Sequence, residues 1–325
     1  MTTHRDPLPS VVETIGETPL VRVHAGPESV PVYAKLETFN PGASVKDRIG
    51  RYMLERMLED GTLEPGGTIV EPTAGNTGIG FAIAAGQLDV RAVFVVPERF
   101  SVEKQQLMRA LGAEVVNTPT EDGMAGAIER ARELAAARDG VVPQQFSNPL
   151  NAEAHYATTA PEIYEALEGR VGAVVAGVGT AGTLMGIARY ARERHPSTHV
   201  AAVEPEGSVY GRAVGRHPRH HEYKTEGIGT NDVATNELFD PDLVDNVIAV
   251  PDRDAQAELK RLAREEGHLA ASSSGAASVA ARQVAEGIEE GAIDAPFDSV
   301  VTVFPDSSER YLSKGIYGSF EEWEG

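Results

Sequence analysis

The sequence of 325 residues contains no cysteine. Disulfides, thiolate catalysis and cysteine-ligated metal sites are therefore excluded, and any sulfur chemistry would have to come from a substrate. No apolar run reaches 18 residues, which argues against a membrane-spanning helix. Residues 1–9 are polar and contain two prolines, unlike a signal peptide. We therefore expect a cytoplasmic protein.

Basic residues are also scarce. Lys and Arg total 29 against 49 Asp and Glu, giving a formal net charge of −20, and only six of the basic residues are lysines. Nucleic-acid binding requires a basic surface, so this composition argues against it. Acid-rich, lysine-poor surfaces suit concentrated salt, where screening removes self-repulsion. We expect a halophilic protein, the alternative being an ordinary acidic surface.

Strand-like and helix-like patterns alternate through most of the chain. Strands are predicted at 32–37, 68–71, 91–96, 114–117, 173–176, 199–204, 247–250 and 299–304. Helices are predicted at 44–60, 77–87, 101–111, 123–138, 183–194, 252–266 and 274–286. An irregular stretch, 206–242, interrupts the second half. The pattern predicts an α/β protein of two domains, each a mostly parallel sheet flanked by helices.

Lys46 is the first candidate catalytic residue. The segment 44–47 fits a capping box, with Ser44 as N-cap and Asp47 three residues later. Lys46 would then lie at the positive end of a helix, where a cation is disfavoured. A neutral amine is what Schiff-base chemistry needs. The alternative is a solvated surface lysine.

Two loops join a strand to a helix and could bind anions. In 71–80, backbone N–H groups and the hydroxyls of Thr73 and Thr77 would surround an anion at the helix start. The segment 176–183 is a second site of this kind. It also carries the pattern G-x-G-x-x-G, and Glu204 follows where a ribose-binding acid would stand. This second loop is therefore equally a nicotinamide-cofactor fingerprint.

Together with the helix entry at 271–276, these segments resemble the cysteine synthase and cystathionine β-synthase family of pyridoxal 5′-phosphate (PLP) enzymes. The similar segments, in family order, are 40–48, 73–78, 144–149, 179–183, 226–229 and 273–277. The resemblance covers nearly the whole chain, from about residue 13 to 317. It implies the tryptophan synthase β-like PLP fold type II, with a smaller mobile domain at 37–155 and a larger one at 156–325 plus 1–36. It also implies a homodimer.

The resemblance assigns roles to particular residues. Lys46 would bind PLP covalently and act as the catalytic base, Asn76 would bind the ring hydroxyl, and Ser274 would face the pyridine nitrogen. The phosphate would be bound by Gly179, Thr180, Ala181, Gly182 and Thr183. The substrate would be bound by Thr73, Ala74, Gly75, Thr77, Gln145 and Gly227. A neutral hydroxyl at the ring nitrogen favours elimination and replacement over transamination.

Two positions depart from the family pattern. Ala74 stands where serine is usual, so one carboxylate hydrogen bond would be missing. Ala181 stands where glycine is usual, and its backbone donor survives this change if φ is negative. The segments 97–106, 118–123 and 304–314 look like bacterial cystathionine β-synthases that use O-acetylserine.

The expected reaction is therefore replacement of the β-substituent of O-acetylserine by sulfide or homocysteine, in cysteine biosynthesis or transsulfuration. Another fold type II lyase, such as a serine/threonine dehydratase, is one alternative. An NAD-dependent dehydrogenase would explain the second loop but not Lys46, and a binding protein on the same fold would not need Lys46. His217, His220 and His221 could mimic a metal site, but a solvated loop is the favoured interpretation, so we expect no metal.

Overall fold

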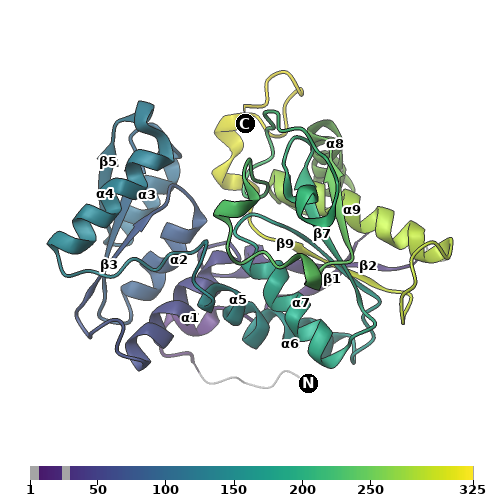
Figure 1. Ribbon diagram of the computed structural model, residues 1–325, viewed down its shortest axis with the longest axis horizontal. Helices are drawn as coiled ribbons and strands as arrows, with labels where there is room; N and C mark the ends of the chain where they lie inside the picture. Colours follow the sequence, from purple (N-terminus) through teal and green to yellow (C-terminus); the bar gives the residue numbers. More distant parts are fainter. Residues whose placement is uncertain (1–6, 24–29, 325) are drawn as a thin grey trace. The chain divides into compact units, whose positions relative to one another are not determined.

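The computed structural model describes residues 7–23 and 30–324, which form two compact units. Unit 1 consists of the residues up to Glu17 and of Phe39–Pro143; unit 2 consists of Thr18–Thr38 and of the residues from Gln144 onward. Figure 1 shows both units as helices around a sheet. The predicted domains differ from these units in the residues up to 17, which were predicted in the larger domain, and in 37–38 and 144–155, which were predicted in the smaller one.

The sheet of unit 1 has three parallel strands in the order β3-β4-β5. Their bounds are Thr68–Pro72, Arg91–Pro97 and Glu114–Thr118. In β4 every residue after Arg91 is buried, as expected for a parallel strand covered on both faces. Helix α4 (Gly123–Ala137) covers one face, where Ala127, Ala131 and Leu134 join a cluster with strand valines. Helices α2 (Asn76–Ala85) and α3 (Val102–Ala110) cover the other (Figure 1).

Helix α1 (Lys46–Glu59) crosses α2 at two glycines. A Cβ on Gly50 would lie 2.3 Å from the Gly80 carbonyl oxygen, and one on Gly80 would lie 2.3 Å from the Lys46 carbonyl oxygen. The two helix backbones therefore touch directly. The close crossing fixes the first turn of α1 relative to α2.

The sheet of unit 2 has six strands in the order β1-β2-β9-β6-β7-β8. Their bounds are Leu20–Val23 (β1), Val32–Leu36 (β2), Val300–Phe304 (β9), Ala173–Gly177 (β6), His199–Pro205 (β7) and Asn246–Val250 (β8). Strand β1 pairs antiparallel with β2, and every other pairing is parallel. The prediction of mostly parallel sheets is confirmed.

Helices cover both faces of this sheet. Helices α8 (Asp252–Arg261) and α9 (Ser272–Glu289) pack on the face that contains Val175 and Val300. Helices α6 (Ala160–Ala166) and α7 (Gly182–Arg194) pack on the face that contains Val174 and Val301. Successive strand residues thus enter opposite cores, which explains the nearly uninterrupted apolar strands.

All the predicted strands and helices are present, with ends shifted by a few residues. The segment 206–242 is irregular as predicted, apart from short 3₁₀ turns at Tyr210–Val214, Val233–Thr235 and Pro241–Leu243. Strand β1, helix α5 (Leu150–Ala154), helix α6 and the π-helical turn His155–Thr159 between them were not predicted. Among the helices of 7–23 and 30–324, none is long and apolar enough to cross a membrane.

Candidate cofactor and substrate site

Lys46 lies in the first turn of α1, as the sequence predicts, but it is the first helical residue and the predicted capping box is wrong. The N-cap is Val45, and the Ser44 hydroxyl accepts the Lys46 N–H at 3.3 Å instead of that of Asp47. The fully buried Asp47 carboxylate accepts the N–H of Gly42 instead, at 2.5 Å. The carboxylate therefore closes the turn that precedes the helix. Lys46 itself is partly exposed at the helix start.

The loop after β3 has the geometry of an anion site. Thr73 and Thr77 are buried, and Gly75 is the N-cap of α2. The Thr73 hydroxyl accepts the Gly75 N–H at 3.3 Å, which holds the loop in a tight turn. A Cβ on Gly75 would meet nothing within 4 Å in the described chain, so the space beside this residue is open. Ala74 and Asn76 are partly exposed beside it. The loop thus leads directly into the N-terminus of α2, the positive end of the helix.

Glycine packing shapes the loop after β6. A Cβ on Gly179 would lie 2.2 Å from the Gly227 carbonyl oxygen, and one on Gly182 would lie 1.9 Å from Asn151 Oδ1. The loop therefore packs directly against Gly227 and Asn151, which leaves no room for a side chain at Gly179 or Gly182. Helix α7 begins at Gly182, so the N–H groups of its first turn are available to an anion. The Thr183 hydroxyl lies 3.2 Å from His155 Nε2.

Ala181 does not meet the condition of negative φ. Its φ is 65° and its ψ −17°, which is the left-handed region that glycine adopts without strain. Its methyl group is buried in the cluster formed with Leu184 and Tyr210. The loop therefore carries a strained residue at a position that glycine would occupy without strain.

Three residues that the sequence did not single out support this loop. Asn151 Nδ2 donates to Thr180 Oγ1 at 3.1 Å and to the Gln145 carbonyl at 2.7 Å. Tyr210 and Asn236 both donate to the carbonyl oxygen of Gly179. They come from α5 and from the irregular stretch, where no periodicity could reveal them. Only the structure shows that these asparagine and tyrosine side chains are buried against the loop.

Gln145 and Gly227, predicted to bind substrate, both lie in unit 2 with Gly179. Gln145 is buried, and Gly227 is exposed with φ 81°. A side chain at Gly227 would meet no atom of the described chain within 4 Å, but the positive φ itself favours glycine. The carbonyl oxygen of Gly227 packs against Gly179, so the segment 226–229 lies next to the loop 179–183.

Ser274 stands in the first turn of α9 and is fully buried. Its backbone N–H bonds the carbonyl of Ala271 at 3.0 Å. Its hydroxyl oxygen has no hydrogen-bond partner among the residues that the structure describes. A buried hydroxyl without a partner costs about 1–3 kcal/mol, so such a group indicates a partner supplied from outside the chain.

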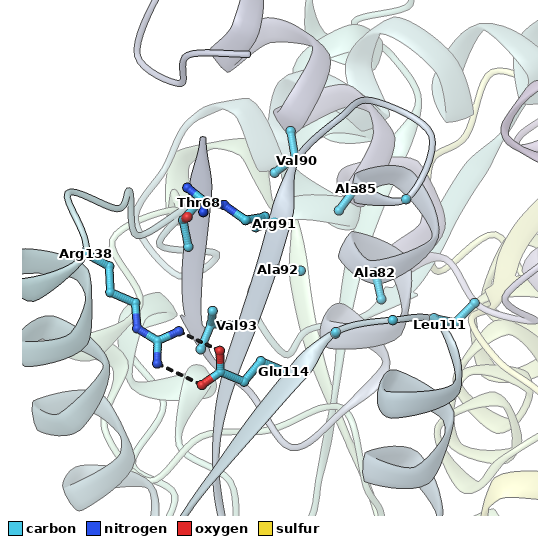
Figure 2. A pocket seen from close by; sticks show the side chains of 13 residues that line it. Thr68, Ala82, Ala85, Val90, Arg91, Ala92, Val93, Leu111, Glu114 and Arg138 are labelled. Carbon is cyan, nitrogen blue, oxygen red and sulfur yellow. Dashed lines mark hydrogen bonds and ion pairs between the residues drawn. The ribbon is translucent and has the colours of Figure 1, made fainter. Parts of the chain in front are cut away.

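A cavity of about 670 Å³ lies elsewhere in unit 1 (Figure 2). Its lining includes Thr68, Arg91 and Glu114, the first residues of β3, β4 and β5. The Arg138 guanidinium donates twice to Glu114, at 2.6 and 2.8 Å, and holds the pKa of that carboxyl below its usual range. The loop at Thr73 follows the opposite, carboxyl end of β3. This cavity is therefore not the candidate substrate site.

Glu204 does not have the environment of a ribose-binding acid. It is buried, and its two carboxylate oxygens accept the backbone N–H groups of Tyr210 at 2.7 Å and Gly211 at 3.0 Å. The carboxylate thus holds the following loop. Because both oxygens already accept backbone hydrogen bonds, Glu204 does not serve as the ribose-binding acid that the nicotinamide fingerprint requires.

The histidines of the irregular stretch make contacts within their own loop. His220 Nδ1 lies 2.9 Å from the Gly207 carbonyl oxygen, and His221 Nδ1 lies 3.0 Å from that of Glu222. Within the described part of the chain, no group of three or more His, Asp or Glu side chains is arranged to hold a metal ion.

Comparison with known proteins decides the family. Residues 11–306 match the family described as pyridoxal-phosphate dependent enzyme. The chain belongs to this family. It is 44% identical to the O-acetylserine dependent cystathionine beta-synthase of Bacillus subtilis, over 94% of this chain and 97% of the relative. It is equally identical, over the same shares, to a cysteine synthase of Helicobacter pylori.

A solved structure of this PLP-dependent family has the same fold. The crystal structure of O-acetylserine dependent cystathionine beta-synthase from Helicobacter pylori superposes with a TM-score of 0.85 at 42% identity, covering 96% of this chain and all of the other. The predicted PLP fold type II is confirmed, and the dehydrogenase alternative is not favoured.

The residues of this chain fit the cofactor of the family. The buried hydroxyl of Ser274 is a neutral hydrogen-bonding group that suits a pyridine nitrogen. The first turn of α7 suits a phosphate. Unit 2 of this PLP-dependent enzyme therefore contains groups whose chemistry suits the ring and the phosphate of PLP.

Proposed function

We propose that the chain catalyses β-replacement on O-acetyl-L-serine, giving cysteine from sulfide and cystathionine from homocysteine. The observation that carries the proposal is the buried, neutral Ser274 hydroxyl, because a carboxylate at that position would favour transamination instead. The names of two relatives, O-acetylserine dependent cystathionine beta-synthase and cysteine synthase, support the same reaction with the two nucleophiles.

Lys46 is proposed as the residue that binds PLP and moves the proton. PLP, when bound, supplies the electron sink for the pair released at the substrate α-carbon. Lys46 Nζ takes the α-proton, acetate leaves from the β-carbon with its bonding pair, and the sulfur nucleophile forms its bond at the same carbon. Nζ then returns a proton to the α-carbon, so atoms and charge balance.

The substrate carboxylate is proposed to bind the loop after β3. Gly75, Asn76 and Thr77 stand at the positive end of α2, where an anion is stabilised. The Thr73 hydroxyl accepts from Gly75, so its proton remains for the carboxylate. Ala74 has no hydroxyl to add, which leaves more room for a second amino acid. Gln145 and Gly227 complete the proposed substrate contacts.

The cofactor contacts are proposed in the same way. Gly179, Thr180, Ala181, Gly182 and Thr183 bind the phosphate, Asn76 binds the ring hydroxyl and Ser274 binds the ring nitrogen. Each sits at or just before the first turn of a helix, α2, α7 or α9. Within unit 2, the N-termini of α7 and α9 thus supply the proposed donors to the phosphate and the ring nitrogen.

Wider properties follow from the same proposal. We infer a cytoplasmic homodimer, as in the related enzymes that the motifs resemble, and a halophilic one, because the net charge is −20. Its substrates are small molecules: O-acetylserine, sulfide and homocysteine.

Parallel initial-rate assays test the reaction. We expect product from O-acetylserine with either sulfide or homocysteine, because a pocket that admits homocysteine discriminates poorly against a smaller nucleophile. L-Serine is the matched control, and it should react slowly because hydroxide leaves less readily than acetate. Cysteine formation without any cystathionine would make the chain a dedicated cysteine synthase. Serine reacting as fast as O-acetylserine would contradict the proposal on the leaving group.

A further inference from the structure

The carbonyl oxygen of Gly179 accepts two side-chain hydrogen bonds. The Tyr210 hydroxyl donates to it at 2.6 Å and Asn236 Nδ2 at 2.7 Å. Asn236 Nδ2 also donates its other hydrogen to the Tyr210 oxygen. Both lone pairs of this carbonyl are therefore occupied, and the three groups form a closed triangle.

This triangle is an unusual use of buried polar groups. Tyr210 is fully buried and Asn236 nearly so, and Asn236 Oδ1 has no partner within the described chain. Turning the amide over would place Oδ1 against the Gly179 carbonyl, two acceptors facing each other. The chain thus keeps an unsatisfied oxygen so that both donors can reach Gly179. Burial raises the pKa of Tyr210, so its hydroxyl remains a donor.

Holding this carbonyl also orients the next N–H group. In a trans peptide the C=O of Gly179 and the N–H of Thr180 lie in one plane and point in opposite directions. Donors fixed on one side of the plane therefore direct the Thr180 N–H to the other side. Thr180 is one of the residues proposed to bind the phosphate.

The loop needs such support because of Ala181. Its φ of 65° is unfavourable for any residue with a Cβ, and strained residues persist where the surroundings over-determine them. On the other side, Asn151 holds the Thr180 hydroxyl. Without these contacts the loop would relax toward a negative φ at Ala181 and turn its N–H groups away.

We propose that Tyr210 and Asn236 are positioning residues that hold the strained loop 179–183 in the conformation that binds a phosphate monoester. The inference rests on the proposed cofactor site and deepens it. It predicts that losing the hydrogen bonds from Tyr210 or Asn236 to the Gly179 carbonyl weakens binding of the phosphate group specifically. It also predicts that glycine at position 181 compensates, because it removes the backbone strain.

The test compares two ligands on the full chain freed of cofactor. PLP and pyridoxal, which lacks the phosphate, are titrated into the wild type, Tyr210→Phe and Tyr210→Phe/Ala181→Gly. Tyr210→Phe should weaken PLP by about tenfold, the effect of one lost hydrogen bond, and leave pyridoxal unchanged. The added Ala181→Gly should restore most of the PLP affinity. Asn236→Leu should reproduce the loss.

Tyr164→Phe is the matched control. Tyr164 is also a buried tyrosine of unit 2, and its hydroxyl donates to Thr198, away from the loop. This variant should bind PLP as the wild type does. Equal weakening of PLP and pyridoxal in Tyr210→Phe, or no rescue by Ala181→Gly, would overturn the inference while leaving the proposed function intact. A wild-type chain that binds no PLP would refute both.

Discussion

At the residue scale, Ser274 differs from other buried serines of α9 in its hydrogen bonding. Neighbouring serines of α9 have partners: the Ser272 hydroxyl accepts the Glu226 N–H at 3.2 Å, and the Ser278 hydroxyl donates to Glu258 at 2.8 Å. The Ser274 hydroxyl has none among the described residues, although it is equally buried. Of the hydroxyls of Ser272, Ser274 and Ser278, only that of Ser274 therefore remains for an external ligand.

Ser274→Asp should change the chemistry rather than the fold. A carboxylate should protonate the pyridine nitrogen and strengthen the electron sink, so that an absorbance band at longer wavelength accumulates. We expect the replacement rate to fall by about tenfold or more, which is roughly 1.4 kcal/mol in the barrier. Ser274→Ala, which adds no charge, is the control and should not develop that band. An unchanged spectrum and rate in Ser274→Asp would show that this residue is not the ring partner.

Two cases show the limits of prediction at this scale. Ser44 and Asp47 have the spacing of a capping box, but the carboxylate bonds Gly42 because the preceding loop folds back on it. Glu204 has the position of a ribose-binding acid, but two N–H groups six and seven residues later occupy it. Sequence spacing gives the reach of a side chain, and local loop geometry decides between competing partners.

Helices and strands were largely predictable because each has a clear period and a clear end. Strand β4 is a mostly apolar run and α9 begins with a row of small residues, so both were found within a few residues. Strand β1 has only four residues, too few for an alternating pattern to be recognised. The segment 150–166 mixes helix with a π-helical turn and contains Pro161, so no single period describes it.

The crossing of α1 and α2 allows a prediction at the scale of elements. Gly80→Ala would place a Cβ 2.3 Å from the Lys46 carbonyl oxygen, so the helices must separate. We expect the free energy of unfolding to fall by about 1–3 kcal/mol, measured as a lower urea midpoint. Uptake of PLP should also weaken, because the first turn of α1 moves.

Gly86→Ala is the control for this crossing. Gly86 ends the same helix with φ −62°, and its new Cβ would lie 3.6 Å from the Ala82 carbonyl oxygen, an ordinary contact. This variant should be neutral or slightly more stable, since alanine favours helix over glycine. Equal midpoints for Gly80→Ala and Gly86→Ala would contradict the account of the crossing.

Charge acts on the molecule as a whole. At −20, self-repulsion is large in dilute salt, and the Debye length falls from about 10 Å at 0.1 M to about 3 Å at 1 M. The melting temperature should therefore rise from 0.1 M to 2 M KCl, with most of the rise below 1 M. Near the isoelectric point of about 4.9 the same salt series should be flatter, because little net charge remains to be screened. A flat or falling curve at pH 7 would refute the halophilic interpretation.

The account of the whole molecule depends on one lysine. Lys35 is buried and its Nζ contacts the Thr18 carbonyl and Glu162, each at 2.6 Å, so its amine is already committed to unit 2. Lys314 forms an ion pair with Glu226, also at 2.6 Å. We propose Lys46, at the start of α1, as the residue that binds PLP, because the segment 40–48 resembles the family's Schiff-base lysine motif.

Borohydride reduction followed by peptide mapping tests this most directly. The purified chain is reduced with its cofactor in place and digested, and the peptide that carries the pyridoxyl group is identified by mass. We predict that the label is on Lys46, and that Lys46→Ala takes up PLP without covalent attachment and has no turnover. A label on Lys35 or on any other lysine, with Lys46 unmodified, would contradict the assignment of the catalytic residue.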